Sequence, residues 1–485
     1  MTEFRSRFDT TRRVPVDEHN IAIQFDESKC KNCSLCRRQC VNTMSIMDYY
    51  YLASTGDNPI CVHCGQCASA CPFGAITERS EVDKVKDAIA DPDKIVIFQT
   101  APAVRVGLGD SFGLPYGSFV EGKMVGALKA LGADLVFDTN YGADLTIMEE
   151  AAELLRRLQS EEAPIPQFTS CCPGWVEFCE IYYPELISNL STTKSPISIL
   201  SAVIKTHYAK EKSIDPKKIV NVCVTPCTAK KAEIRRPELN ASSYYWDEPD
   251  LRDTDLCITT RELASWIQSE SLDFDAIEEA PFDRAFSEAS GGGVIFGNSG
   301  GVMEAALRTA YYYFTGRKAP DIFLPFEPVR GMEGVKKATV TFGHFVIHVA
   351  AISGLANARA FIDDLIENDK FEDYSFIEIM ACPGGCIGGG GQPLTKLPKQ
   401  KEAKEARIAA LYKRDEECAV RSSWENPEIQ QLYTDFLDKP LGEEAETYLH
   451  TYFTNKHDML GKMDHVVPET NPDSTRFKPH TANKV

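Results

Sequence analysis

Two cysteines stand in a glycine-rich segment that directly follows an apolar run. Residues 376–393 have the sequence Phe-Ile-Glu-Ile-Met-Ala-Cys-Pro-Gly-Gly-Cys-Ile-Gly-Gly-Gly-Gly-Gln-Pro, so Cys382 and Cys386 follow the end of a predicted strand. Pro383 and six glycines between residues 384 and 391 prevent regular structure and let the backbone approach a bulky group closely. A flexible linker with two buried cysteines is the alternative interpretation, and the other cysteines decide between the two.

Two further strand ends carry cysteines beside proline. Residues 169–175, Thr-Ser-Cys-Cys-Pro-Gly-Trp, contain adjacent thiols that point opposite ways in extended chain, so one can bind metal while its neighbour, Cys171, stays free. Residues 219–224 lead into Thr-Pro-Cys, followed by Lys230, which either donates to an anionic ligand or is an ordinary surface lysine. Four thiols from three strand ends suffice for one 4Fe-4S cluster: Cys172, Cys227, Cys382 and Cys386.

Eight cysteines near the N-terminus form two runs of C-x2-C-x2-C-x3-C. This spacing is typical of bacterial two-cluster ferredoxins, in which the fourth cysteine of each run binds the cluster of the other run. Two structural zinc sites are the alternative, but zinc sites use C-x2-C pairs rather than a doubled run of four. We therefore expect one 4Fe-4S cluster on Cys30, Cys33, Cys36 and Cys71, and a second on Cys61, Cys64, Cys67 and Cys40.

Composition limits the class of protein. The 485 residues, of which 43% are hydrophobic, predict a globular protein of two to four domains. Seventeen cysteines without an N-terminal signal or an 18-residue apolar run predict a cytoplasmic protein whose thiols bind metal or catalyse, with no membrane segment. The net charge of −19 argues against nucleic acid as a partner. Residues 28–40 are an exception, because they carry Lys29, Lys31, Arg37 and Arg38 and no acidic residue.

The elements that must position these cysteines follow an α/β pattern after residue 93. Predicted strands at 94–98, 133–137, 219–224, 256–258 and 376–380 alternate with predicted helices such as 125–131 and 149–158. Chemistry in such folds lies at strand-end loops, one of which is 99–103. Residues 338–351 predict a hairpin, and 400–450 predict charged helices. We expect an arm at 1–20, an α+β ferredoxin-like domain at 21–85, a mixed α/β domain at 86–455 and an extended tail at 456–485.

One predicted helix carries a row of charged residues. Thr146 and Glu149 form a capping box that predicts a helix from there to about residue 159. Glu150, Glu153 and Arg157 share one face of it, which is usually a solvated, salt-bridged surface. Glu149 is off this stripe, and its replacement by Gln is expected to be nearly silent. Two serines follow: Ser195 before Pro196 predicts an N-cap, whereas Ser191 has no local task.

The three cysteine segments resemble the signature segments of the FeFe hydrogenases in order and spacing, and the ferredoxin runs resemble members with two accessory clusters. The resemblance covers about residues 20–450. It implies an H-cluster, in which a 4Fe-4S cube is bridged by a cysteine thiolate to a two-iron subsite with CO, cyanide and azadithiolate. It also implies reversible conversion of H2 into protons and electrons, maturation proteins that deliver the subsite, and ferredoxin or flavodoxin as the electron partner.

The resemblance also implies roles for individual residues. Cys172, Cys227 and Cys382 match ligands of the cube, and Cys386 matches the bridging ligand. Cys171 matches the thiol that exchanges protons with the subsite amine, and Lys230 matches the lysine that binds a cyanide. The implied proton path runs from Cys171 through a water, Glu153, Ser191 and Glu150 to Arg157 at the mouth. The residues implied around the cofactor are Pro102, Ala103, Ile197, Thr225, Pro226, Phe296 and Met380.

Three of these positions depart from the commoner family pattern, which has methionine at 225, glutamine at 197 and often serine at 103. Because Ile197 offers no amide donor, we expect a more electron-rich subsite and a bias toward H2 production, with the Thr225 hydroxyl replacing part of the lost donation. A sensory hydrogenase-like protein and a hydrogenase-like iron–sulfur assembly factor are the alternative functions. Four cysteines outside every motif are expected to be buried core thiols: Cys179, Cys223, Cys257 and Cys418.

Overall fold

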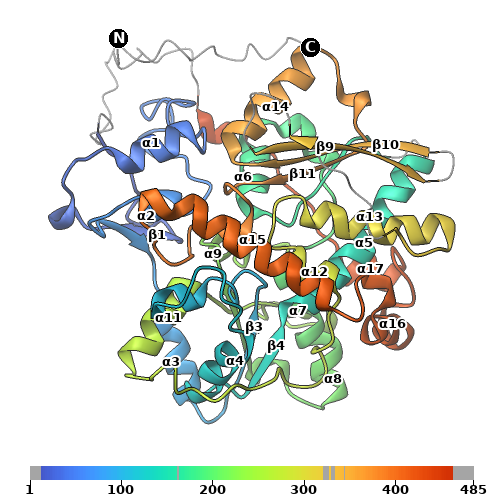
Figure 1. Ribbon diagram of the computed structural model, residues 1–485, viewed down its shortest axis with the longest axis horizontal. Coiled ribbons are helices and arrows are strands. Elements are labelled where there is room, and N and C mark those ends of the chain that lie inside the picture. The colour runs from blue at the N-terminus through green and yellow to red at the C-terminus, as the bar shows by residue number, and fades with distance from the viewer. Residues whose placement is uncertain (1–11, 161–162, 321–326, 329–333, 343–344, 462–485) are drawn as a thin grey trace.

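A computed structural model of the chain describes residues 12–160, 163–320, 327–328, 334–342 and 345–461. Two sheets form its framework, and Figure 1 shows the five-stranded sheet above the four-stranded one, with helix α15 crossing in front of them. The fold is the mixed α/β architecture that the alternating pattern predicts. Among the described residues, no helix is both long and apolar enough to cross a membrane.

The four-stranded sheet is entirely parallel, in the order β4-β3-β6-β7. Helices cover both faces, which is why Val96, Ile97 and Phe98 form a continuous buried run rather than an alternating one. All four strands lie where the sequence predicts them, with ends that differ by three residues or fewer. They are β3 Ile95–Thr100, β4 Leu135–Asp138, β6 Ile219–Thr225 and β7 Leu256–Thr259.

The second sheet has the order β5-β11-β10-β9-β8. Strands β5, β11 and β10 are parallel, whereas β10, β9 and β8 are antiparallel, so the predicted hairpin at 338–351 is confirmed. Strand β11 has the predicted bounds. The strands are β5 Gln167–Phe168, β8 Glu327–Pro328, β9 Val335–Phe342, β10 Phe345–Ser353 and β11 Phe376–Met380.

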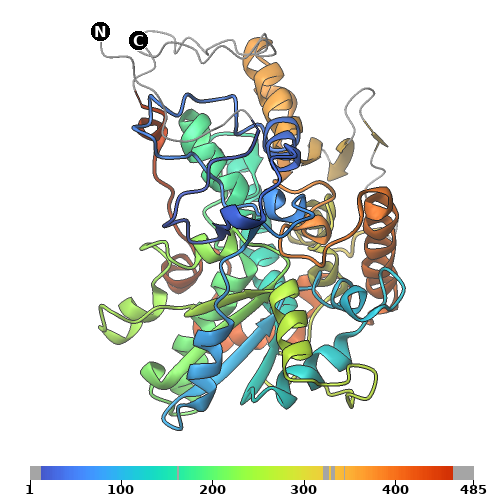
Figure 2. The same ribbon diagram turned by 90° about the vertical axis from the view of Figure 1, so that its left-hand side faces the viewer.

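Helices fill the space around and between the sheets (Figures 1 and 2). The central ones are α5 Thr139–Gln159, α7 Pro196–Val203, α12 Gly291–Ile295, α13 Gly301–Thr315 and α15 Gln400–Glu417. The others are α1 Leu35–Asn42, α2 Gln66–Ser69, α3 Val82–Ala90, α4 Glu121–Ala130, α6 Pro173–Tyr182, α8 Ala209–Glu211, α9 Lys230–Glu233, α10 Ala241–Trp246, α11 Thr260–Ser269, α14 Leu355–Glu367, α16 Pro427–Leu432 and α17 Glu443–Leu449.

Helix α5 has its N-cap eight residues earlier than the capping box predicts. Strand β4 runs directly into it, and the Asp138 carboxylate accepts the first capping bond from Asn140 N at 2.8 Å. Thr146 lies inside the helix, where its hydroxyl donates to Lys194 O at 3.2 Å. The predicted start is therefore wrong, because the strand that feeds the helix supplies the cap, while the predicted end at residue 159 is right.

The N-terminal module contains α1, α2 and a two-stranded antiparallel sheet of β1 Ile23–Phe25 and β2 Ile76–Glu78. Its core is continuous with the core around Trp175 and Ile379 of the larger body, so the two parts pack as one unit (Figure 2). The expectation of a loose arm is wrong for Val14 and Val16, which are buried in this core; residues 1–11 lie outside the described part.

The chain segments at two of the expected domain boundaries pack against the larger body. Helix α3 occupies the predicted boundary, but Val85 is fully buried in the same apolar cluster as Val96 of β3. We therefore propose that the α/β domain begins near residue 80 rather than 86. The expected extended tail lies mostly outside the described residues, yet its first part is anchored, since Lys456 pairs with Glu177 at 2.5 Å and Leu460 is buried.

The C-terminal helices contact both the cysteine loops and the charged stripe. Arg407 of α15 donates to Ile387 O at 2.8 Å and pairs with Asp110. His450, just after α17, contacts the Thr192 hydroxyl at 2.8 Å, and its backbone forms a β-bridge with Thr193. This segment is therefore part of the wall around residues 191–194 rather than a separate appendage.

Candidate active site

The three cysteine loops meet because they leave the carboxyl ends of parallel strands. Strands β5 and β11 are parallel neighbours in one sheet, and β6 belongs to the other. Ala381 N donates to Cys172 Sγ at 3.3 Å, which joins the first loop to the third. Burial raises the pKa of the Cys227 thiol, and the nearby thiols of Cys172 and Cys386 raise it further. The structure thus brings together the four cysteines that the sequence predicts as one set.

Glycine is required where the third loop is most crowded. Gly385 has φ of 89°, and a Cβ there would lie 2.7 Å from Ser299 N. A Cβ on Gly390 would lie 2.1 Å from the carbonyl oxygen of Cys64. The loop is therefore packed between the α12–α13 turn and the N-terminal module, which excludes the flexible-linker interpretation.

The donor set fits a cluster better than a single ion. Burial raises the pKa of Cys386 to about 12, so the protein alone does not stabilise its thiolate; a bound metal centre would. Within the described ranges, no three His, Cys, Asp or Glu side chains converge on one ion position. Zinc needs such convergence, whereas a 4Fe-4S cube takes each thiolate at a different iron.

The N-terminal module contains two cavities lined by cysteine. Near the first, the pKa of Cys36 is raised by burial and by the thiols of Cys71 and Cys33. These are the two crossed sets that the ferredoxin spacing predicts, in which the fourth cysteine of one run joins the first three of the other. The first cavity is lined by Cys30, Cys33, Cys36 and Cys71, and the second by Cys40, Cys61, Cys64 and Cys67.

The second of these cavities adjoins the strand-end cysteines. The Cys382 thiol acts electrostatically on Cys64, whose pKa is raised first by burial. Gln66 Nε2 donates to Gly388 O and Ser69 Oγ to Gly390 O, both at 2.9 Å, so α2 holds the glycine loop against the module. Cys33, in the other set, is exposed. The three sets therefore form a series from the surface to the interior.

Cys171 lies in an apolar pocket. It packs with Phe296 and Met380 in one buried cluster, and its carbonyl accepts a bond from Lys230 Nζ at 3.1 Å. Burial lowers the pKa of Lys230, but Glu233, which pairs with it at 2.5 Å, and the thiols of Cys227 and Cys171 together raise it above its usual value. Lys230 is buried, so the interpretation of an ordinary surface lysine is wrong.

The other predicted pocket residues are also buried, but on different walls. Ala103 packs beside Cys386, and Ile197 packs with Cys223 and Cys257. The Thr225 hydroxyl donates to Cys227 O at 3.0 Å. The hydroxyl is thus bonded within its own loop, and the expectation that it replaces part of a lost donor stays a prediction. Pro102 and Pro226 are buried at the ends of β3 and β6.

The charged stripe of α5 lies inside the protein rather than on a solvated surface. Glu150 and Glu153 are each 1% exposed, and Arg157 is 5% exposed. Arg157 Nη2 and Ser191 Oγ both donate to the Glu153 carboxylate at 2.7 Å. Arg157 also donates to the carbonyls of residues 164, 188 and 190, so the stripe ends at a buried cation.

The order of the two carboxylates is the reverse of the one expected. The pKa of Cys171 is raised by burial and then by Glu150, so Glu150 is the carboxylate beside the thiol, whereas Glu153 is paired with Arg157. Helix α5 starts near the cluster loops and runs away from them, so the residue one turn later is more distant. The geometry gives the sequence Cys171, Glu150, Ser191, Glu153, Arg157.

Glu150 differs from Glu153 in its partners. Its Oε2 atom has no hydrogen-bond partner in the described part of the chain. Burial raises its pKa well above the usual value, and the nearby Glu153 and Glu378 carboxylates raise it further, whereas Ser191 and Arg157 oppose the rise. Glu150 is therefore protonated more readily than an ordinary glutamate.

The sequence analysis did not identify the burial of two other carboxylates. Glu149 is fully buried and accepts bonds from the Tyr433 hydroxyl and, at 2.8 Å, from Leu441 N. Its replacement by Gln is therefore expected to disturb these bonds, and the prediction that it is nearly silent in turnover stays a prediction. Glu378 accepts from Gly300 N at 2.6 Å and Met303 N at 2.9 Å. Of the two, only Glu149 has a sequence signal. It lies one residue off the charged stripe, and this position on the helix faces another element.

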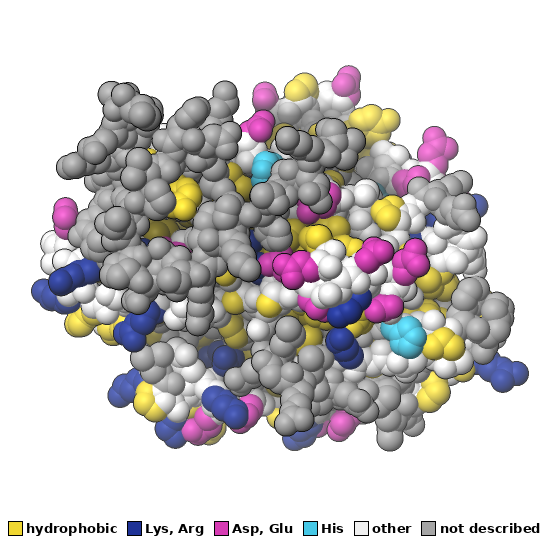
Figure 3. All heavy atoms as spheres, turned by 90° about the horizontal axis from the view of Figure 1, so that it is seen from above, with side chains coloured by type: hydrophobic (Ala, Val, Ile, Leu, Met, Phe, Trp, Pro, Cys, Tyr) yellow, Lys and Arg dark blue, Asp and Glu magenta, His cyan; other side chains and the backbone are white. Residues whose placement is uncertain are grey.

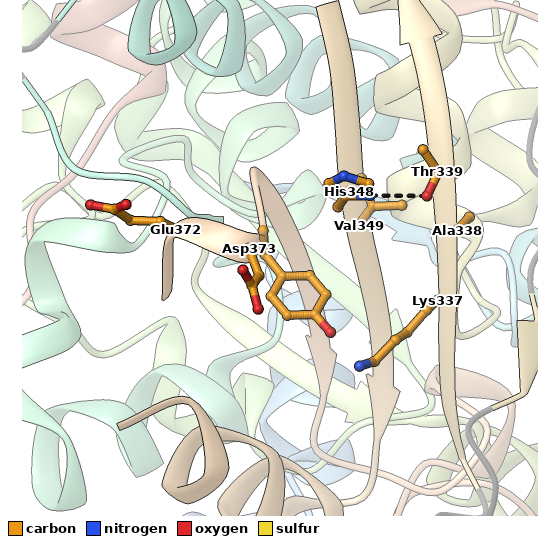
Figure 4. Close-up of a pocket in the computed structure, with 8 residues that line it drawn as sticks. Lys337, Ala338, Thr339, His348, Val349, Glu372 and Asp373 are labelled. Carbon is orange, nitrogen blue, oxygen red and sulfur yellow. Dashed lines mark hydrogen bonds between the residues drawn. The ribbon is translucent and has the colours of Figure 1, made fainter. Parts of the chain in front are cut away.

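A surface hollow lies away from the cysteine sets (Figure 4). Its residues come from β9, β10 and the turn before β11, and His348 faces the Thr339 hydroxyl at 2.9 Å. None of the residues that line it is a cysteine. They are Lys337, Ala338, Thr339, His348, Val349, Glu372, Asp373 and Tyr374.

A protein that gathers its thiols in three adjoining sets beside a row of buried carboxylates is built to move electrons and protons together, which places it among the iron–sulfur oxidoreductases. Comparison with known families agrees. Residues 94–390 match the model of the iron-only hydrogenase large subunit, C-terminal domain. Residues 57–77 match the 4Fe-4S binding domain, and residues 401–456 match the iron hydrogenase small subunit.

Individual relatives cover most of the chain. The HndD subunit of the NADP-reducing hydrogenase of Solidesulfovibrio fructosivorans is 42% identical over 449 residues, which are 89% of this chain and 74% of that one. Iron hydrogenase 1 of Clostridium pasteurianum is 41% identical over 450 residues, 90% and 76% of the two chains. A structure of apo [FeFe]-hydrogenase HydA1 from Chlamydomonas reinhardtii aligns with a TM-score of 0.69 at 39% identity, over 78% of this chain and 99% of that one.

The chain belongs to the FeFe, or iron-only, hydrogenase family. It is an oxidoreductase that interconverts H2 with protons and electrons at an H-cluster, and 4Fe-4S clusters accompany that cofactor.

Because Glu150 and Glu153 have different surroundings, we expect their substitution to change the free energy of unfolding by different amounts. Glu153→Gln leaves Arg157 as a buried unpaired cation and should lower the free energy of unfolding by about 3–5 kcal/mol. Glu150→Gln removes a carboxyl that lacks a cationic partner and should change it by under about 1 kcal/mol. Urea unfolding of the cofactor-free protein measures both. Equal losses would contradict the assignment of Arg157 to Glu153.

Glu378 predicts a pH dependence of stability. Burial raises the pKa of Glu378 from 4.5 to about 7, although the backbone amides that bond to it have the opposite effect. The folded state therefore binds the carboxyl proton more tightly than the unfolded state. Its contribution to stability is therefore full below pH 4.5 and is lost as the pH rises to about 7. Glu378→Gln should flatten this fall in unfolding midpoints of the cofactor-free protein. An unchanged slope would show that the carboxyl does not titrate there.

Proposed function

We propose that the enzyme passes electrons between its H-cluster and an external carrier through two accessory 4Fe-4S clusters. The observation that carries this proposal is the series of three cysteine sets, with exposed Cys33 at one end and the close pair of Cys64 and Cys382 at the other. Each cluster would lie next to another, so electrons need not cross a long stretch of protein. The outer set would be the point of entry and exit.

We assign the cube to Cys172, Cys227, Cys382 and Cys386, and Cys386 would also hold the two-iron subsite. The bound cofactor supplies the H–H bond chemistry and the redox capacity. Buried Lys230 places a positive charge where anionic ligands of the subsite would lie. Ile197 and Thr225 offer no free side-chain donor on their walls, which supports the expected electron-rich subsite and bias toward H2 production.

The protein's own residues would move the proton. Cys171 would hold the proton at Sγ inside the apolar pocket. Glu150, whose pKa is raised by burial, can take up the proton to form the neutral acid and can then release it. The Ser191 hydroxyl can both donate and accept, and it already donates to Glu153 at 2.7 Å. Arg157 fixes the far oxygen of Glu153 and so keeps the outer carboxylate oriented. A row of proton carriers of this kind favours a turnover enzyme over the sensory alternative.

Substitution of the thiol tests the catalytic assignment. Cys171→Ala should leave all three clusters assembled and lower H2 turnover by roughly 10²–10⁴-fold, because the innermost proton carrier is lost. The measurements are iron content, electron paramagnetic resonance, infrared bands of CO and cyanide, and H2 production rates. Cys179→Ala is the matched control, since Cys179 is equally buried but lies outside every cysteine set.

The outcomes are distinct. Full turnover in Cys171→Ala would reject this proton path. Absence of CO and cyanide bands in the matured, unsubstituted protein would reject the H-cluster ligand set, and an iron content matching fewer than three cubes would reject the accessory-cluster assignment.

We further propose that an acidic ferredoxin or flavodoxin docks beside the outer cysteine set. In the view of Figure 3, Lys and Arg side chains gather on the left, the side of the N-terminal module, and acidic ones over the centre and right. Lys31, Arg38 and Cys33 are exposed, and Phe73, which lines the same cavity, is 46% exposed. A basic rim around an exposed ligand suits an acidic carrier.

Two of the four expected docking cations are less suited to this role. Arg37 is 13% exposed and pairs with Asp48 at 2.7 Å, and Lys29 pairs with Asp26 at 3.2 Å. Their charges are partly neutralised within the chain. The docking proposal therefore rests on Lys31 and Arg38.

Charge reversal at Lys31 and Arg38 should lower the rate with ferredoxin and spare the rate with a small dye, because only the protein carrier needs the basic rim. The loss should shrink as salt is raised. Lys413→Glu is the control, since this lysine is equally exposed on α15. A ferredoxin rate that is unaffected by the double reversal would refute the docking site.

A further inference from the structure

Asn298 is a buried amide without a hydrogen-bond partner. It lies in the turn between α12 and α13, is 1% exposed, and neither its Nδ2 nor its Oδ1 atom has a partner among the described residues. Buried side-chain amides in folded proteins nearly always bond to protein or water, since an unpaired one costs about 1–3 kcal/mol. Its polar atoms are therefore suited to a group that the polypeptide does not provide.

The backbone around Asn298 is held against the loop that carries Cys386. Ile387 N donates to Gly297 O and Ser299 N donates to Gly384 O, each at 3.1 Å. A Cβ on Gly385 would lie 2.9 Å from the carbonyl carbon of Asn298, so the two backbones are in direct contact. The amide is thus fixed within one residue of both clamping bonds.

The same turn also borders the pocket of Cys171. Phe296, two residues before Asn298, packs with Cys171 and Met380. Gly297 lies against Ala103, because a Cβ on this glycine would be 3.4 Å from the Ala103 Cβ. The turn therefore borders the proposed cofactor site on two sides.

We infer that the Asn298 amide donates an N–H bond to the sulfur of the cluster held by the Cys386 loop and so tunes its reduction potential. Such a bond stabilises the reduced, more negative state of the cluster and raises its potential. This inference rests on the proposed ligand set. Asn298 is a positioning and tuning residue, and it takes no part in proton transfer. A buried water is the competing partner for the amide.

The test compares Asn298→Leu, which keeps the branching at Cγ but removes the donor, with Asn298→Ser, which keeps a shorter donor. In the matured holoenzyme, the potential at which the CO and cyanide bands change on reduction should shift to more negative values in Asn298→Leu and by less in Asn298→Ser. The paramagnetic signals of the accessory clusters should keep their potentials. In the cofactor-free protein, Asn298→Leu should unfold at the same temperature as the unsubstituted chain or a higher one, since no bond within the polypeptide is lost.

Asn140 provides a matched control. It is equally buried, and its two polar side-chain atoms also lack partners in the described part of the chain, but it lies on α5 against Gly293 rather than on a cysteine loop. Asn140→Leu should leave the cluster potential unchanged.

An unchanged potential in Asn298→Leu, with the cube assembled, would overturn the inference and assign the amide to a buried water. A marked fall in the stability of cofactor-free Asn298→Leu would also overturn it, because it would reveal a partner within the polypeptide. Failure of the unsubstituted protein to assemble the cube would instead reject the ligand set itself.

Discussion

The close approach of the glycine loop to its neighbours is the constraint on which the rest of the structure depends. Residues 384–391 contact the turn after α12 and the carbonyl of Cys64, and at Gly390 there is no room for a side chain. That contact buries Cys382, leaves Cys386 only partly exposed and brings the N-terminal module against the cofactor site. A looser loop would separate the thiol sets and admit water to groups whose electrostatics depend on its exclusion.

Burial also explains how α5 can carry charge through the interior. Glu153 shares its carboxylate among Arg157, Ser191 and the Thr192 backbone, so its charge is compensated locally. Glu150 lacks a cation of its own, and its raised pKa makes the neutral acid the accessible form. One turn of helix thus places a compensated anion next to a group that exchanges protons readily.

The sequence predicts the strand ends, the four-cysteine set and the crossed ferredoxin sets because these depend on spacing and on short, strongly apolar runs. It does not predict which end of α5 faces the cofactor site. The expected path therefore placed Glu153 next to Cys171, whereas Glu150 occupies that position in the structure. Local pattern favours a cap at Thr146, but the strand before the helix supplies Asp138. The position of Glu149 beside the stripe shows that it faces another element, but its partners lie more than a hundred residues away along the chain and no local pattern identifies them.

The C-terminal segment has a consequence for assembly. Residues 401–456 match a family described as a small subunit, yet here they belong to the same chain as the cysteine loops. Arg407 binds the carbonyl of Ile387, and His450 contacts Thr192 beside the proposed proton path. A tethered segment meets its binding surface at a high effective concentration, so the contact does not weaken on dilution. The wall around the buried carboxylates is consequently complete in every folded chain, at any protein concentration.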